Sequence, residues 1–194
     1  MKLWIHASAE ARSGFFALLA IYWISETILL QRMRAGVQDR DEDRGSSGWL
    51  AILFPLGWLS AVVLTGLRQF SFGSSSVFAA GLCAMAAGQL LRWWSIATLG
   101  RLFTVNVAIR EGHRLVTHGP YRWVRHPSYT AVLLFHVGAA ACLGNVLSVI
   151  ALVACSTAGL LIRMRVEEDA LLRGLGAEYA AYLQRTKRLI PGVY

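Results

Sequence analysis

The apolar stretch "TAVLLFHVGAAACLGNVLSVIALVACSTAGLLI", residues 130–162, decides the fold. A single helix of its 33 residues would be about 50 Å long, whereas the hydrocarbon core of a bilayer is about 30 Å thick. The tripeptide "LGN", residues 143–145, interrupts the stretch with residue types that end helices and form turns. We therefore expect a hairpin of two transmembrane helices, over residues 130–144 and 146–162.

Three more apolar blocks precede this hairpin, at residues 14–30, 47–67 and 76–98. Each is long enough to span a bilayer as a helix. Hydrophobic residues make up 56% of the chain and charged residues 15%, which lies outside the usual range of soluble domains. Since no linker divides the sequence, residues 1–194 are expected to form one domain, an all-α integral membrane protein with about five transmembrane helices.

The positive residues indicate how the chain is oriented. If the C-terminal end is cytoplasmic, residues 31–46, 99–129 and 163–194 are cytoplasmic and hold fifteen of the 19 Lys and Arg residues. Such a bias is typical of cytoplasmic loops. Membrane anchoring thus explains the net charge of +8, and nucleic acid is not expected as a partner. The three cysteines lie within apolar runs without metal-ligand or disulfide spacing, so no metal site is expected.

The segment before the hairpin, "HRLVTHGPYRWVRHPSY" at residues 113–129, has a dense cluster of cationic and aromatic side chains. Pro127 stands where a helix is about to begin, and proline is well tolerated at the first helical position. His126 would then cap that helix, beside backbone N–H groups that bind carboxylates or phosphates. Alternatively, Tyr121, Trp123 and Tyr129 form an aromatic belt at the membrane surface and the arginines are ordinary anchors.

The segment after the hairpin begins with Arg163 and Glu167, which are four residues apart and hence neighbours on one helical face. Ionisable groups at the membrane boundary usually pair or take part in function. The alternative is a helix-end salt bridge worth a few tenths of a kcal/mol. Apolar residues then recur at helical spacing, which predicts a C-terminal amphipathic helix on or folded over the cytoplasmic face.

Three motifs together resemble one family. They are "GHRLVTHGPYRWVRHPSYTAVLL" at residues 112–134, "RMRVEEDALL" at 163–172 and "GAEYAAYLQRTKRLIP" at 176–191. The combination is similar to the isoprenylcysteine carboxyl methyltransferase family and its phospholipid methyltransferase relatives. The resemblance covers residues 99–191, and it implies catalytic elements at 99–129 and 163–191. It further implies a membrane enzyme that transfers a methyl group from S-adenosyl-L-methionine to a lipophilic acceptor, with a cytoplasmic cofactor-binding loop.

The resemblance also implies which residues do this. Arg163 matches the family position that binds the acceptor, Glu167 closes the cofactor pocket, and these two are the expected catalytic residues. Asn106 stands where relatives often carry glutamine. The expected cofactor-binding residues are Asn106, His113, Arg114, Leu115, Val116, Tyr121, His126, Pro127, Ser128, Tyr129 and Glu167.

The acceptor stays open at this point. The resemblance favours carboxyl methylation of an isoprenylcysteine-type substrate, either a small molecule or a lipidated protein. The first alternative is methylation of a phospholipid or thiol, and the second is a nicotinamide-dependent membrane reductase; a non-catalytic membrane scaffold is a third. The short chain and its compact extramembrane part favour a multi-pass protein of a prokaryotic inner (plasma) membrane, in contact with membrane lipids and with its active site facing the cytoplasm.

Other polar residues are given ordinary roles. Glu26 either pairs with the arginines that end its apolar block, which we favour, or lines the pocket. Arg92 is expected to extend to the membrane interface. Residues 39–44, "DRDEDR", are expected to form a solvated loop. His136 is expected to be a packed or hydrogen-bonded core histidine.

Overall fold

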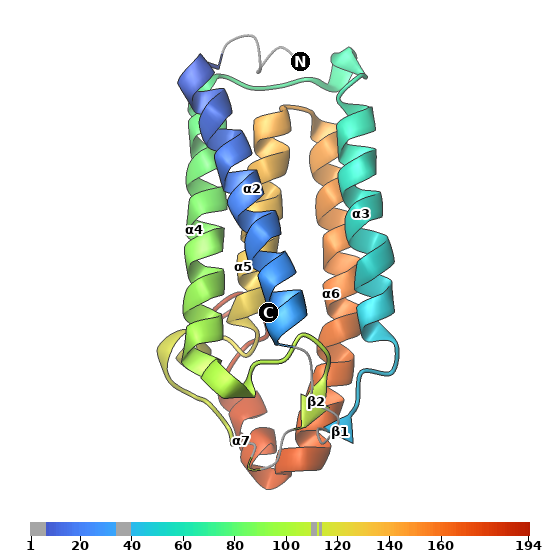
Figure 1. The fold of residues 1–194 in the computed structure, drawn as a ribbon, viewed down its shortest axis with the longest axis vertical. Coiled ribbons are helices and arrows are strands. Elements are labelled where there is room, and N and C mark those ends of the chain that lie inside the picture. The colour runs from blue at the N-terminus through green and yellow to red at the C-terminus, as the bar shows by residue number, and fades with distance from the viewer. Residues whose placement is uncertain (1–6, 34–39, 110–111, 113) are drawn as a thin grey trace.

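The computed structural model describes residues 7–33, 40–109, 112 and 114–194. In this part of the chain, five long helices run along the long axis, and a shorter helix and a two-stranded sheet lie at one end (Figure 1). The helices are α2 (Ala9–Arg32), α3 (Ser46–Leu64), α4 (Ser75–Leu99), α5 (Pro127–Leu143), α6 (Val146–Leu175) and α7 (Ala177–Arg185). The strands are β1 (Arg40–Asp41) and β2 (Ala108–Ile109), and single 3-10 turns are η1 (Arg68–Phe70), η2 (Gly100–Leu102) and η3 (Gly119–Arg122).

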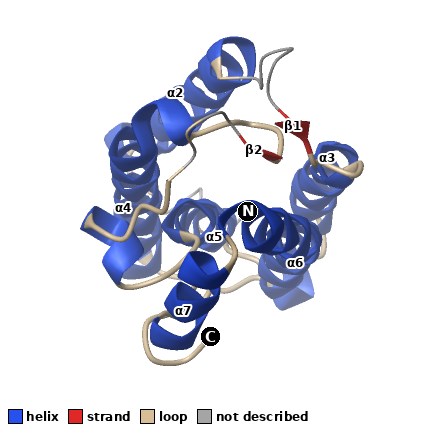
Figure 2. Ribbon diagram, turned by 90° about the horizontal axis from the view of Figure 1, so that it is seen from below, coloured by secondary structure: helices blue, strands red, loops and turns tan. Residues whose placement is uncertain are grey.

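The chain runs up and down the bundle, so the connections that follow α2, α4 and α6 meet at the same end (Figure 1). Seen from this end, α7 lies beside α5 and α6, and the antiparallel β1–β2 pair lies between α2 and α3 (Figure 2). These connections include the two segments that the sequence marks as functional. The fold therefore brings them together even though a helical hairpin separates them in the chain.

The predicted break between two antiparallel helices is present in the structure. Helix α5 ends at Leu143, and Gly144 follows in the left-handed region with φ of 66°, which is favourable for glycine. Asn145 caps α6, because its Oδ1 accepts hydrogen bonds from the N–H groups of Leu147 (2.9 Å) and Ser148 (3.2 Å). Three residues thus reverse the chain and provide a hydrogen-bond acceptor for the free N–H groups at the start of the second helix.

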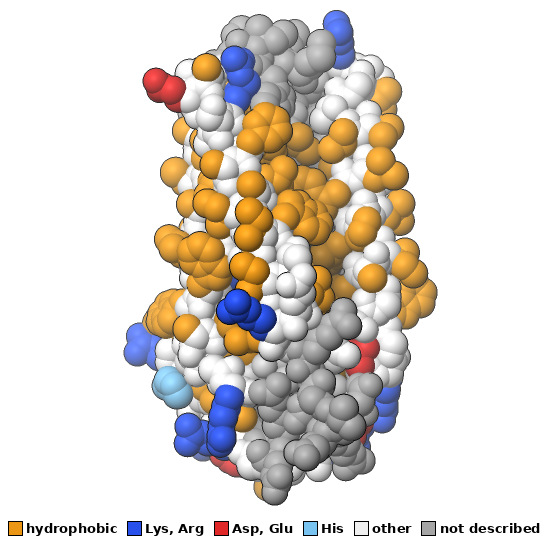
Figure 3. Space-filling model, in the orientation of Figure 1, with side chains coloured by type: hydrophobic (Ala, Val, Ile, Leu, Met, Phe, Trp, Pro, Cys, Tyr) orange, Lys and Arg blue, Asp and Glu red, His pale blue; other side chains and the backbone are white. Residues whose placement is uncertain are grey.

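The described helices identify a membrane protein. Helices α2, α3 and α6 are each long and apolar enough to cross a bilayer, and α5 is an apolar helix of 17 residues. Large apolar side chains point outward along them, among them Ile24, Leu59 and Val63, which are 60%, 63% and 66% exposed. Figure 3 shows such side chains along the bundle, with Lys and Arg toward its ends. The number of five crossings stays a prediction, since α4 does not meet the same criterion.

Small residues allow the helices to approach closely. A Cβ atom added to Gly88 of α4 would lie 2.7 Å from the backbone nitrogen of Phe135 and 2.8 Å from the carbonyl oxygen of Ala131, both on α5. Close packing of this kind stabilises helix pairs in lipid, where the hydrophobic effect does not drive association. The core beside this contact contains a stacked pair, Tyr22 and Phe135, whose ring centroids are 4.1 Å apart.

His136 is the core histidine that the sequence predicts. It is fully buried, its Nδ1 lies 2.7 Å from Ser156 Oγ, and its Nε2 accepts from the indole N–H of Trp58 at 3.4 Å. Both ring nitrogens therefore have protein partners inside the bundle.

The expectations for Glu26 and Arg92 are wrong. Arg92 does not extend to the interface; it is buried, and its Nε and Nη2 donate to the two carboxylate oxygens of Glu26, each at 2.9 Å. Its Nη1 donates to the hydroxyl of Ser128 at the start of α5. A two-point guanidinium–carboxylate pair satisfies both charges within the bundle, so neither side chain has to reach the surface.

The C-terminal segment is divided between two helices. Helix α6 continues to Leu175, and a turn at Gly176, with φ of 54°, separates it from α7. The amphipathic helix that follows is short, and its buried face contains Tyr179 and Tyr182. Its apolar side packs against the end of the bundle.

Candidate active site

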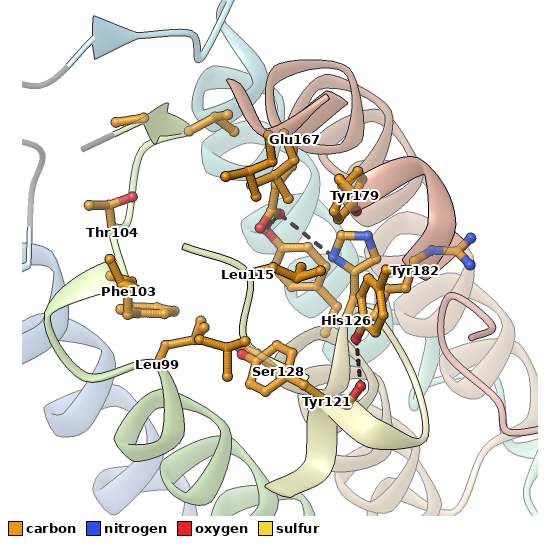
Figure 4. A pocket seen from close by; sticks show the side chains of 18 of the residues that line it. Leu99, Phe103, Thr104, Leu115, Tyr121, His126, Ser128, Glu167, Tyr179 and Tyr182 are labelled. Carbon is orange, nitrogen blue, oxygen red and sulfur yellow. Dashed lines mark hydrogen bonds and ion pairs between the residues drawn. The ribbon is translucent and has the colours of Figure 1, made fainter. Parts of the chain in front are cut away.

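A pocket lies at the end of the bundle where the connections meet (Figure 4). The segment after α4, the start of α5, the second half of α6 and α7 all contribute to it. It holds about 840 Å³ of space that no protein atom fills, its open mouth included. Its walls are Leu99, Leu102, Phe103, Thr104, Asn106, Val107, Ala108, Arg114, Leu115, Val116, Tyr121, Arg125, His126, Ser128, Tyr129, Arg163, Glu167, Leu171, Leu175, Tyr179 and Tyr182.

The expected cofactor and acceptor residues converge on this pocket. All of them line it except His113 and Pro127. His113 lies outside the described residues, and Pro127 is the buried first residue of α5. The structure thus brings most of the expected cofactor and acceptor residues to one pocket, and the role of each residue stays a prediction.

The start of α5 has the predicted geometry. His126 occupies the cap position and Pro127 the first helical position, and within the described residues no side chain caps the helix. Ser128 and Tyr129 follow on the first turn and face the pocket. The positive end of the helix dipole therefore meets a cavity instead of a capping carboxylate or hydroxyl, which favours an anionic group of a ligand there.

Arg163 and Glu167 do not form the direct pair that their spacing suggests. Tyr129 lies between them: its hydroxyl donates to Glu167 Oε2 at 2.6 Å and accepts from Arg163 Nε at 3.3 Å. His126 Nδ1 is 3.7 Å from the same Glu167 oxygen, and the rings of His126 and Tyr129 stack with centroids 5.3 Å apart. The polar wall of the pocket is thus one connected network.

The direct partner of Arg163 is Asp43, so the expectation that residues 39–44 form a solvated loop is wrong at this position. Asp43 is 6% exposed, and its Oδ1 accepts from Arg163 Nη1 at 2.5 Å. Arg163 Nη1 also contacts Ser46 Oγ at 3.1 Å, and Nη2 donates to the Val105 carbonyl. Four of the five guanidinium N–H groups therefore have acceptors among the described residues, which leaves one for a ligand.

Hydrogen bonds hold Asp43 in its ionised form. Burial alone would raise its pKa, but the N–H and hydroxyl of Ser47, the N–H of Val107 and the nearby charge of Arg163 together lower the pKa below its ordinary value. The β1–β2 pair joins this loop to the segment that carries Val107. A single acidic residue in a charged run has no sequence signal that would distinguish it from its neighbours, and only the packing of α3 beside α6 reveals its partner.

Glu168 is a second residue that sequence reasoning missed. It is buried, and its Oε1 lies 3.1 Å from His126 Nε2. Arg125 Nε donates to it at 3.0 Å and Arg188 Nη2 at 2.6 Å. Glu168 therefore holds the imidazole of His126 in place, and through Arg188 it also connects the C-terminal segment to the site. The adjacent acidic pair "EE" in the sequence is the only signal for it, since consecutive helical residues point in different directions.

The rest of the pocket is apolar and aromatic. Leu102, Val116 and Tyr121 form a buried cluster on one side, and Leu171 and Leu175 line the wall from α6. Tyr182 donates from its hydroxyl to the carbonyl of Tyr121 at 2.5 Å, which fastens α7 over the pocket. A pocket with an apolar body and a few convergent polar groups binds an amphipathic organic molecule.

Together, the fold and this pocket define a helical membrane protein with a partly polar pocket at one end of its bundle. Comparisons with family models, curated proteins and solved structures all find the same family. Residues 80–173 match the isoprenylcysteine carboxyl methyltransferase (ICMT) family. Protein-S-isoprenylcysteine O-methyltransferase B of Arabidopsis thaliana is 38% identical over 134 residues, 68% of this chain and 66% of the relative. Its paralogue A is 33% identical over 145 residues, 73% of this chain and 72% of the relative.

A solved structure agrees. The eukaryotic intramembrane Ras methyltransferase ICMT superposes with a TM-score of 0.67 and 25% identity, over 95% of this chain and 67% of that protein. The chain belongs to the isoprenylcysteine carboxyl methyltransferase family, as its motifs suggest, and it is a methyltransferase. The relatives named here are eukaryotic, so they give no support to the expectation of a prokaryotic inner membrane.

Proposed function

We propose that this protein transfers a methyl group from S-adenosyl-L-methionine to the carboxylate of an isoprenylcysteine-type acceptor, at the cytoplasmic face of a membrane. The observation that carries the proposal is the start of α5, which no described side chain caps and which faces a pocket with apolar and polar walls at one end of a membrane bundle. In this proposal, the polar cofactor would enter the pocket from water and the lipidic acceptor from the bilayer. Family membership supports the same reaction.

The residues present fit the proposed cofactor. The first turn of α5 would hold its carboxylate, and Glu167, an acceptor-only group on the same wall, would accept hydrogen bonds from its ammonium. The aliphatic side chains Leu115, Leu171 and Leu175 offer an apolar surface for its adenine ring. When bound, the cofactor supplies an electrophilic methyl group together with its own leaving group.

The protein's task is then alignment and exclusion of water. A carboxylate acceptor is already ionised at neutral pH, so its oxygen needs no general base before it bonds to the methyl carbon. Arg163 would orient that carboxylate with its charge and with the one N–H group that has no acceptor among the described residues. We do not expect Arg163 to donate two hydrogen bonds to the acceptor, because its Nη1 and Nη2 groups already donate to Asp43, Ser46 and Val105.

The cytoplasmic location of the pocket rests on the distribution of charge. The three segments that meet at the pocket end contain fifteen of the 19 Lys and Arg residues. Cytoplasmic loops carry such an excess. The proposal therefore places cofactor entry on the cytoplasmic side, where S-adenosyl-L-methionine is available.

The test is methyl transfer by the purified full-length chain in detergent. Labelled S-adenosyl-L-methionine is offered with N-acetyl-farnesylcysteine, with N-acetylcysteine as the control that lacks the isoprenoid, and with a phospholipid. We expect a base-labile methyl ester on the farnesylated compound alone. Arg163→Ala should lower turnover by about 10² with little change in cofactor affinity, whereas Glu167→Ala should weaken cofactor binding. Label on the phospholipid or on sulfur, or no transfer to any of the three, would overturn the proposal.

A further inference from the structure

The hydroxyl of Tyr179 is a buried polar group without a partner. Tyr179 is 2% exposed and lines the pocket from α7, near Glu167 and His126 (Figure 4). Among the residues that the structure describes, its Oη makes no hydrogen bond. The two other buried side-chain atoms without partners in that part of the chain, Ser71 Oγ and Gln89 Oε1, do not belong to residues that line the pocket.

Tyr182 shows that a tyrosine hydroxyl on α7 can find hydrogen-bond partners within the protein. Tyr182 lies three residues farther along the same helix, and its hydroxyl donates to the carbonyl oxygens of Tyr121 (2.5 Å) and Val124 (3.4 Å). Its hydroxyl therefore fastens the helix to the bundle, whereas that of Tyr179 has no such role. Leaving a buried donor unpaired is unfavourable, so a residue with this environment is best explained by a partner that arrives with the ligand.

The surroundings indicate the chemistry of that partner. Burial and the carboxylates of Glu168 and Glu167 raise the pKa of Tyr179, so its hydroxyl is protonated at neutral pH and can donate. The same wall contains the aliphatic side chains of Leu171 and Leu175. A flat apolar ring with polar atoms at its edge, or the hydroxyl-bearing sugar attached to it, matches this combination of an apolar surface and one donor.

We infer that Tyr179 binds the nucleoside half of the cofactor through its hydroxyl group. This assignment rests on the proposed use of S-adenosyl-L-methionine, and it adds a contact from α7 to those expected from the loop before α5. It also gives α7 a role in the site, since its packing over the pocket brings Tyr179 to the ligand.

The experiment compares Tyr179→Phe with Tyr182→Phe in the full-length protein, by calorimetric titration with S-adenosylhomocysteine and by thermal unfolding with and without it. Loss of one hydrogen bond should weaken binding to Tyr179→Phe by about three- to tenfold. Without ligand, Tyr179→Phe should unfold at the wild-type temperature or above, because it removes an unsatisfied group, whereas Tyr182→Phe should unfold at a lower temperature. Competition by 5′-methylthioadenosine, which contains only the nucleoside half, should weaken by the same factor in Tyr179→Phe.

Each other result contradicts the inference. Unchanged affinity in Tyr179→Phe would show that the hydroxyl does not bind the ligand, and a lower unfolding temperature without ligand would show that it has a structural role instead. A change confined to S-adenosylhomocysteine, or no competition by 5′-methylthioadenosine in the wild type, would rule out the nucleoside contact. If the wild type binds no adenosyl compound, the proposed function itself fails, and this is distinguishable from wild-type binding that Tyr179→Phe leaves unchanged.

Discussion

Replacement of Asp43 by asparagine tests whether a loop outside the family motifs holds Arg163, the arginine that we propose binds the acceptor. Among its hydrogen bonds with described residues, the Asp43 carboxylate accepts from Arg163 Nη1 (2.5 Å), Ser46 Oγ (3.1 Å), Val107 N–H (3.2 Å), and the N–H (3.0 Å) and hydroxyl (2.8 Å) of Ser47. Asparagine keeps the shape but loses the charge, and its NH₂ group would face a donor in either orientation. The buried guanidinium of Arg163 would then lose the carboxylate that it contacts directly.

Breaking one partner of a buried ion pair destabilises a protein by about 3–5 kcal/mol. For a chain of this size, that corresponds to a fall in unfolding temperature of roughly 6–20 °C. Turnover should fall by about 10², because a displacement of Arg163 by about an ångström misaligns the acceptor. Differential scanning fluorimetry in detergent and single-turnover methyl transfer, performed at a temperature where the variant is folded, measure the two effects separately.

Glu42→Gln is the matched control. Glu42 is the neighbouring acidic residue, and its ion pair with Arg173 (2.8 Å) is partly exposed, with 38% of the Arg173 side chain and 10% of the Glu42 side chain accessible. Such pairs contribute about 0–1 kcal/mol, so this variant should resemble the wild type in stability and turnover. An Asp43→Asn protein with wild-type unfolding temperature and turnover would refute the reasoning.

The pH dependence of stability gives an independent check. Because the pKa of Asp43 is lowered in the folded state, its contribution is fully present above the ordinary aspartate pKa and is lost as the pH falls through the lower folded value. The difference in stability between wild type and Asp43→Asn should therefore shrink as the solution is acidified below that ordinary pKa. A constant difference over the acidic range would mean that the carboxylate charge is not the source of the effect.

Two further predictions concern the bundle. Gly88→Ala should destabilise the protein by about 1–3 kcal/mol in thermal unfolding, because the new Cβ would lie 2.7 Å from the backbone of α5. The control is Gly48→Ala, whose Cβ would have no atom within 4 Å and which should be neutral or slightly stabilising. Equal effects of the two changes would argue against close α4–α5 packing. In a protein whose native cysteines are replaced by alanine, Ser74→Cys and Gln184→Cys, both at exposed positions, should react with an impermeant maleimide from opposite sides of a sealed membrane, and labelling from one side would contradict the proposed topology.

Local patterns in the sequence determined the membrane character, the hairpin and the start of α5. The break at "LGN" is a property of neighbouring residues, because a left-handed glycine and an asparagine cap act within one turn. The same holds for Pro127, whose ring has the backbone angle of a first helical residue. The family resemblance supplied the remaining site residues, and of those that the structure describes all but Pro127 line one pocket.

Only the tertiary structure decided the partners of the charged groups. Arg163 has a carboxylate four residues away in the chain, yet it pairs with Asp43, 120 positions earlier, and Arg92 pairs with Glu26, 66 positions earlier. Helical spacing predicts which residues share a face of one helix. It does not predict the partner of a buried charge, because that partner needs suitable geometry and low exposure to water. That choice depends on which helices pack together, and the contacts of α3 with α6 and of α2 with α4 connect residues too distant in the sequence for any local pattern to relate them.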